Sequence, residues 1–238
     1  MNPDSKPLTK SELDHSLAVS ARLGDVEKVR QGLMAGADAK HNGSAALTWA
    51  AINGSVECVK LLIPVSDVQA HDSMALRRAA ESGHTECVEI LIPASGSGES
   101  CFLALNAAVE NGHVECVKIL LPRTNVRHKN FYALQIAAAR GYAGCVSLLL
   151  PQSAALLDQH GFVAEILWKG RVDILAQLLA FKPSLLDHLD LWHCMDNACQ
   201  DGNHELASFF NSLMERRSIA DSAPSSGASG PVAAPRRL

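Results

Sequence analysis

The chain has 238 residues, of which 47% are hydrophobic and 5% aromatic, with a formal net charge of −4 at pH 7. This balance supplies apolar material for a core and gives no overall attraction to nucleic acid or to an anionic membrane. No apolar run approaches the ~20 residues that a membrane-spanning helix requires. We therefore expect no nucleic-acid partner, no membrane segment and no secretory signal, and the odd number of cysteines, 7, favours a reducing, cytoplasmic compartment.

The first expected element is a helix that begins after Thr9. Thr9 and Glu12 have the spacing of a capping box, in which each side chain accepts a hydrogen bond from the other residue's backbone N–H. Apolar residues recur at helical spacing up to Gly24, and a second helix is expected over about 26–33. We expect residues 1–8 to form a flexible N-terminus and the two helices to form one helix–turn–helix unit.

Four later segments repeat one pattern at a fixed interval. Each has a glycine, then a cysteine, then a proline, and an alanine precedes each glycine at a constant distance. A fixed period of this size indicates stacked units, none of which buries its apolar face alone. In each unit we expect a first helix packed closely through the alanine and a second helix that ends at the proline. The glycines, each 29 residues after the last, are Gly54, Gly83, Gly112 and Gly141.

The segment from Ala46 to Leu62 resembles an ankyrin repeat. It begins Ala46-Leu47-Thr48-Trp49-Ala50-Ala51-Ile52-Asn53-Gly54, and several of its positions recur in the following units. The resemblance extends over about residues 12–215 and implies an all-α solenoid of stacked helix–turn–helix repeats with short connecting loops. Because the period is shorter than the ~33 residues of the family, we expect the projecting hairpin finger between units to be shortened or absent.

Atypical units bound the regular array. Residues 163–170 keep the frame but place Ile166 in the small-residue column, and a last unit begins at Met195. We expect about seven units: a first cap, the regular repeats, a divergent repeat and a last cap, because end units must cover the core with a polar face. The expected domains are the repeat array at 9–215 and a disordered Ser-, Ala-, Gly- and Pro-rich tail at 216–238.

The repeated cysteines invite a metal or redox interpretation that their spacing does not favour. Helices of neighbouring units lie about 8–10 Å apart, whereas a disulfide needs Cα atoms within about 7 Å and thiolates sharing a zinc ion lie roughly 4 Å apart. We interpret this column as small buried hydrophobic residues and expect no cofactor and no metal. Thiol or metal chemistry at His193, Cys194 and Cys199 is an alternative. The column comprises Cys58, Cys87, Cys116 and Cys145.

No residue pattern typical of an enzyme is visible. The sequence shows no nucleophile–base pair, phosphate-binding glycine loop or metal-spaced histidine pair, so we predict no catalytic residues and no enzyme. His84 and His113 follow turn glycines and are interpreted as hydrogen-bonding turn residues. The basic run Arg123–Lys129 is interpreted as a solvated loop, with an acidic protein or nucleic acid as alternative partners.

The resemblance places function on the first helices of the units. In ankyrin arrays these inner helices line a concave face that holds partner proteins, and the residues just before the glycine vary there. We predict a monomeric, non-enzymatic scaffold or adaptor that binds an unidentified protein through this face. A thiol- or metal-responsive regulator and a host-directed, effector-type repeat protein are the alternatives. The partner-binding residues carried over are Trp49, Ile52, Asn53, Arg78, Glu81, Ser82, Glu110, Asn111, Ile136 and Arg140.

Overall fold

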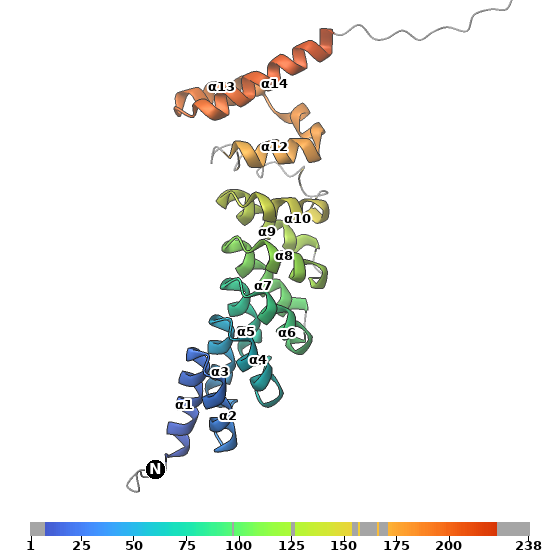
Figure 1. Ribbon diagram of the computed structural model, residues 1–238. Helices are drawn as coiled ribbons and strands as arrows, with labels where there is room; N and C mark the ends of the chain where they lie inside the picture. The colour runs from blue at the N-terminus through green and yellow to red at the C-terminus, as the bar shows by residue number, and fades with distance from the viewer. Residues whose placement is uncertain are drawn as a thin grey trace, which may run out of the picture. The chain divides into compact units, whose positions relative to one another are not determined.

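The computed structural model describes residues 8–96, 98–124, 127–153 and 171–222, together with Leu157 and Ile166. Within these residues the chain forms α-helices and short 3₁₀ helices and contains no strand (Figure 1). The all-α architecture predicted from the repeats is therefore confirmed. The chain divides into two compact units, Met1–Lys182 and Pro183–Leu238, and each is described by itself.

The first unit begins with a helical hairpin whose ends follow from the sequence. The Glu12 N–H donates to the Thr9 hydroxyl, and the Thr9 N–H donates to the Glu12 carboxylate at 2.7 Å. This is the predicted capping box, which satisfies backbone donors that the start of a helix leaves unpaired. Helix α1 (Lys10–Leu23) ends at Gly24, which has a φ of 69°, and α2 (Val26–Met34) follows.

The helices of the first unit form two rows. The first helix of each hairpin packs against the first helix of the next hairpin, and the second helices contact one another in the same order. We term these the inner row and the outer row. Among the described helices, the inner row comprises α1, α3 (His41–Ile52), α5 (Ala70–Glu81), α7 (Gly98–Glu110) and α9 (Arg127–Arg140). The outer row comprises α2, α4 (Val56–Leu62), α6 (Thr85–Ser95), α8 (Val114–Leu120), α10 (Ala143–Ser153) and α12 (Val172–Phe181).

The repeated apolar positions form continuous buried columns in this unit. In the regular repeats the alanine before each turn glycine has no exposed surface, so neighbouring inner helices can approach closely. A leucine three residues earlier is equally buried, and so are the cysteine and valine of each outer helix. The columns are Ala50, Ala79, Ala108 and Ala137; Leu47, Leu76, Leu105 and Leu134; Cys58, Cys87, Cys116 and Cys145; and Val59, Val88, Val117 and Val146.

The repeated proline ends the α-helix in some repeats and not in others. Helices α4 and α8 give way to 3₁₀ turns that contain Pro64 and Pro122. Helices α6 and α10 continue through Pro93 and Pro151, which lie in their last turns. A proline there removes a single backbone bond close to a helix end, where carbonyls already lack partners, so the helix tolerates it. The prediction that proline ends every second helix is therefore wrong for α6 and α10. Among the described residues, the 3₁₀ helices are Ile63–Val65, Leu121–Arg123 and Pro183–His188.

Left-handed turns occupy the connections at which ankyrin repeats have a projecting hairpin finger. The first residues of α3, Asn42–Ser44, have φ values of 52°, 65° and 61°, and His71–Ser73 of α5 have φ values of 50°, 57° and 57°. Each turn precedes the regular part of the inner helix. The Ser44 hydroxyl then accepts a hydrogen bond from the Asp67 N–H at 2.8 Å and holds the next connection against the helix. The described connections contain no strand, so the finger is absent from them.

The basic run at 123–129 is only partly a loop. Arg123 ends a 3₁₀ helix and Arg127 begins α9, whereas residues 125 and 126 lie outside the described part of the chain. The interpretation of the whole run as a loop is therefore wrong at its C-terminal end. A helix forms there because the inner row repeats the same hairpin in every regular unit.

The divergent repeat is described only in part. Of residues 163–170, Ile166 alone is described, and it is buried. The Arg171 N–H donates to the Ile166 carbonyl at 3.4 Å, and α12 then packs against α10. The outer row therefore continues beyond the regular repeats.

The second unit contains one further helical hairpin. Helices α13 (Leu191–Gln200) and α14 (His204–Ser222) pack against each other, and Phe210 is fully buried in this unit. Helix α14 extends past the predicted start of the tail at residue 216, and residues 223–238 of that tail lie outside the described residues. Among the described helices, none is both long enough and apolar enough to cross a membrane.

Candidate functional site

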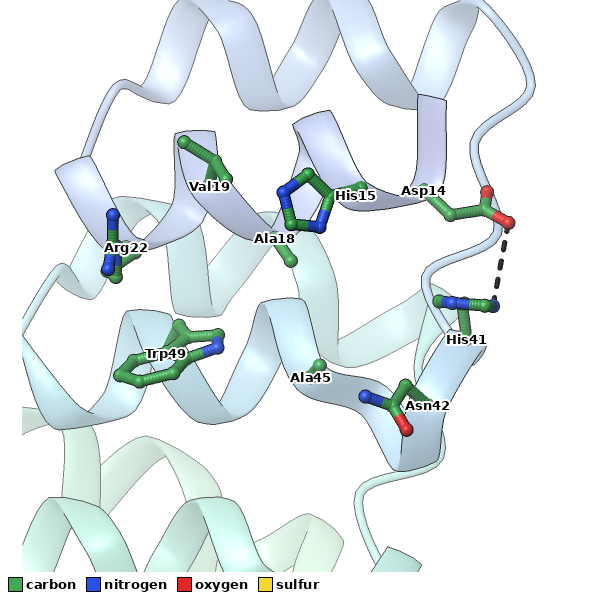
Figure 2. A pocket seen from close by; sticks show the side chains of 9 residues that line it. All are labelled: Asp14, His15, Ala18, Val19, Arg22, His41, Asn42, Ala45 and Trp49. Atoms are coloured by element: carbon green, nitrogen blue, oxygen red, sulfur yellow. Dashed lines mark ion pairs between the residues drawn. The ribbon is translucent and has the colours of Figure 1, made fainter. Parts of the chain in front are cut away.

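Two adjoining grooves lie on the inner row, one on each side of Trp49. The α1/α3 groove has a volume of about 320 Å³ and the α3/α5 groove a volume of about 510 Å³. Trp49 lines both grooves and is 40% exposed, although tryptophan is highly buried on average in folded proteins. Figure 2 shows the α1/α3 groove, with Asp14 and His41 at one end and Arg22 and Trp49 at the other.

Arginines from two neighbouring helices flank the indole. The Arg22 guanidinium of α1 lies 5.8 Å from the centre of the Trp49 ring, which is a cation–π distance. Arg78 of α5 lines the α3/α5 groove and pairs with Glu81 at 2.8 Å. Both side chains of that pair are 42% exposed, and exposed pairs of this kind contribute at most about 1 kcal/mol. Both guanidinium groups therefore remain accessible beside Trp49.

Among the described residues, the one carboxylate that lines the α1/α3 groove is that of Asp14, which is buried and faces the chain's own groups. Asp14 has a side chain that is only 5% exposed, and one of its oxygens accepts a hydrogen bond from the Asp38 N–H at 2.6 Å. The other oxygen lies 3.6 Å from His41 Nδ1, the contact drawn as a dashed line in Figure 2. Asp14 thus anchors the connection after α2. The exposed groups of the same groove, His15, Arg22 and His41, are neutral or cationic.

Bonds between repeats cap the C-terminal ends of the inner helices. His84 Nε2 lies 2.9 Å from the Ile52 carbonyl oxygen, and His113 Nε2 lies 2.9 Å from the Glu81 carbonyl oxygen. The last carbonyls of a helix have no partner within the helix, so an imidazole N–H from the next repeat supplies one. The two histidines form hydrogen bonds at the turns, as the sequence suggested, but the acceptor belongs to the preceding repeat.

The predicted partner-binding residues differ in exposure. All lie at or near the C-terminal ends of inner helices, and Trp49, Ile52 and Arg78 come together in the α3/α5 groove. The structure does not bring the others into that groove. The exposed members are Trp49, Asn53, Ser82, Asn111 and Arg140, and the half-buried members are Ile52, Arg78, Glu81, Glu110 and Ile136.

Internal hydrogen bonds occupy some of these side chains. The Asn53 amide donates to the carbonyl of Arg22, and the Arg140 guanidinium donates to the carbonyl of Glu110 at 2.7 Å. Asn111 donates to a carbonyl one turn back in its own helix at 2.9 Å. Asn53 and Arg140 therefore join neighbouring repeats, whereas Asn111 caps the end of the inner helix in its own repeat.

Several residues that line the grooves are not among the predicted partner-binding residues. His71 and Met74 line the α3/α5 groove, and Arg22 and Asn42 line the α1/α3 groove. No repeat pattern indicates Arg22, because it belongs to the first hairpin, which departs from the regular repeats. His71 and Asn42 belong to left-handed turns that no local motif indicates. Met74 alone could have been predicted from the sequence. It precedes Arg78 by one helical turn, so the two side chains lie on the same face of the helix.

The cysteine column behaves as core. Cys58, Cys87, Cys116 and Cys145 are buried, and all 7 cysteines of the chain are free thiols. Burial raises the pKa of the Cys87 and Cys145 thiols to about 11, because removal from water disfavours the thiolate. A raised thiol pKa lowers reactivity at neutral pH, since the thiolate is the nucleophile and the metal ligand.

The alternative thiol or metal site is poorly formed. Cys194 and Cys199 lie on α13, where a separation of five residues turns the side chains about 140° apart around the axis. Cys194 is half-buried, and burial raises its thiol pKa. Within the described residues, no group of three or more His, Cys, Asp or Glu side chains could hold a metal ion.

Alkaline pH is expected to destabilise the first unit through these thiols. The ordinary thiol pKa is 9.0 and the folded value for Cys87 and Cys145 is about 11, so the folded state binds protons more tightly. Their contribution to stability is complete below pH 9 and is lost as the pH rises through about 11. Denaturant midpoints measured between pH 8 and pH 11 should fall less steeply for a Cys87→Val, Cys145→Val variant than for the wild type. Equal slopes would contradict the assignment.

The comparison with known families supports the repeat architecture. The family model described as "Ankyrin repeats (3 copies)" matches residues 17–102 and 100–160, which is more than half of the chain. The matched segment contains α1 from Leu17 onward, the regular repeats and the whole α3/α5 groove, and it contains the α1/α3 groove except for Asp14 and His15. No curated protein matches the sequence.

Proposed function

Because the chain belongs to the ankyrin repeat family, whose repeats are generally non-enzymatic protein-interaction modules, we propose that it is a scaffold that binds a partner protein through its inner row. The supporting observation is a contrast between neighbouring positions. The position four residues before each turn glycine is a buried alanine in every regular repeat, whereas the preceding position varies freely. That variable position holds Trp49, Arg78, Ala107 and Ile136.

The grooves beside Trp49 provide the strongest contact region within the described inner row. Tryptophan and arginine are the side chains most enriched among residues that dominate binding energy, and such residues cluster in pockets that exclude water. Trp49 and Arg78 line one groove of about 510 Å³ together with Ile52. The proposed contact face is therefore centred on α3 and α5, and the other predicted residues extend it along α7 and α9.

A cytoplasmic location and a monomeric state are parts of this proposal. Support for the location comes from the 7 free cysteines, since a protein of an oxidising compartment would be expected to pair them. Light scattering on the purified chain tests the monomeric state.

A double truncation tests the use of the inner row. The partner is first isolated by affinity purification on the wild-type chain, and its dissociation constant is then measured with purified components. Trp49→Ala with Arg78→Ala should weaken binding by at least about 30-fold, because truncation of one dominant interface residue costs about 2 kcal/mol or more.

The matched control lies outside the inner row. Val65→Ala with Lys118→Ala removes one exposed apolar side chain from the 3₁₀ helix that follows α4 and one exposed cation from α8. This control should retain wild-type affinity. If both double variants bind the partner equally well, the inner row is not the binding face.

A further inference from the structure

We propose that the two grooves beside Trp49 take an acidic peptide segment of the partner, in which carboxylates flank one large apolar side chain. This inference rests on the proposed function and specifies the chemistry of the partner. Charge complementarity is its first support. The groups that line the two grooves and carry or can gain positive charge are Arg22, Arg78, His15, His41 and His71. Asp14 is the one carboxylate among these lining residues.

Asp14 does not offset this positive character at the surface. Its side chain is 5% exposed, and its two oxygens face the Asp38 N–H and His41. Glu81 pairs with Arg78 through one guanidinium nitrogen and does not line the groove itself. An arginine has five N–H donors, so Arg78 keeps donors for a carboxylate of the partner. Exposed ion pairs are also weak enough to exchange readily.

The arrangement of the two arginines fits a carboxylate on each side of an apolar residue. Arg22, Trp49 and Arg78 come from three successive inner helices, α1, α3 and α5. Neighbouring packed helices lie about 8–10 Å apart, so the indole separates two guanidinium groups by a distance that a short peptide spans. Guanidinium groups recognise carboxylates through paired hydrogen bonds, which gives the orientation as well as the attraction.

An apolar side chain has a place between these charges. The α3/α5 groove is lined by Trp49, Ile52 and Met74 as well as by Arg78, and its volume is about 510 Å³. Methionine adapts its shape to different apolar groups, so this groove suits a leucine or a phenylalanine of the partner. The same column further along the inner row holds Ala107 and Ile136, which carry no charge. The acidic segment is therefore assigned to the first three inner helices.

A peptide selection tests the assignment. A library of random displayed peptides is selected against the full chain, and enriched sequences are synthesised with a fluorescent label. Enriched peptides should carry Asp or Glu on both sides of one large apolar residue. Their affinity should fall at least tenfold in an Arg22→Gln, Arg78→Gln variant and should weaken as salt concentration rises, because the contacts are ionic.

The control keeps the change in net charge identical. Arg30→Gln with Lys118→Gln also removes two cations, and both of these residues form exposed i,i+3 pairs on the outer row, as Arg78 does on the inner row. This control should bind the selected peptides like the wild type. Circular dichroism and thermal melting of every variant establish that the fold is kept.

Several outcomes overturn the inference. These are the enrichment of neutral or basic peptides, the absence of any enriched peptide, equal losses in the two charge variants, and tight binding of a single-stranded RNA oligonucleotide that depends on Arg22 and Arg78. A different result would contradict the proposed function, namely a natural partner whose binding does not depend on Trp49. If the natural partner does depend on Trp49 but the selected peptides lack acidic residues, the inner row binds proteins and only the acidic segment is wrong.

Discussion

The Gly83→Ala variant is expected to lose about 2–3 kcal/mol of folding free energy. Gly83 has a φ of +77°, and a left-handed conformation costs a residue with a β-carbon about 1–2 kcal/mol. A β-carbon at this position would also lie 2.7 Å from His113 Nδ1. The ring must then move, and its bond to the Glu81 carbonyl, worth about 1 kcal/mol, is lost. Denaturant unfolding followed by far-UV circular dichroism measures the change.

Two further variants separate the causes of this loss. Gly36 has a φ of +90°, but a β-carbon added there would meet no atom within 4 Å, so Gly36→Ala should show the backbone cost alone. In a His113→Ala background the substitution at Gly83 should cost about 1 kcal/mol less than in the wild type, because the ring that it displaces is gone. A cost at Gly83 that matches Gly36 and does not depend on His113 would refute the role of the ring.

The Ala108→Leu variant is expected to lose about 2–3 kcal/mol. Ala108 has no exposed surface, and its helix α7 packs between α5 and α9. Leucine is nearly as good a helix former as alanine, so the loss comes from steric overpacking in the column and not from the helix itself. Denaturant midpoints of the full chain give the measurement.

Ala139→Leu is the matched control for this overpacking. Ala139 also lies on an inner helix, α9, but it is half-buried and stands outside the alanine column. Its substitution should change stability by no more than about 0.5 kcal/mol. If both leucine variants are equally stable, close packing of the inner row does not depend on the small side chain.

The turn histidines and the turn glycines depend on each other. Each imidazole joins two repeats, and each turn glycine leaves room for the ring that follows in the next repeat, as at Gly54 and His84. The glycine and the histidine of the sequence pattern therefore form one inter-repeat contact across a separation of about one period. Where the pattern changes, a different side chain takes the same place. A β-carbon at Gly112 would meet the Tyr142 ring at 2.9 Å, and one at Gly141 would meet the Arg171 guanidinium at 2.8 Å.

The sequence by itself determined the features that are local or periodic. The capping box at Thr9 and Glu12 needs only residues three apart, and the glycine at the end of α1 needs only its own backbone freedom. The burial of the alanine and cysteine columns follows from their repetition, because matching residues of stacked units must share one environment. The all-α solenoid was predictable for the same reason.

Only the tertiary structure decided how the repeats meet. The acceptor of His113, the inward turn of Asp14 and the capping role of Arg140 all depend on backbone groups about 24–32 residues away. The grooves beside Trp49 combine side chains from α1, α3 and α5, and both α3 and α5 contain an irregular left-handed turn near their start. Local pattern does not specify such contacts, since they are set by the lateral distance and rotation between packed helices.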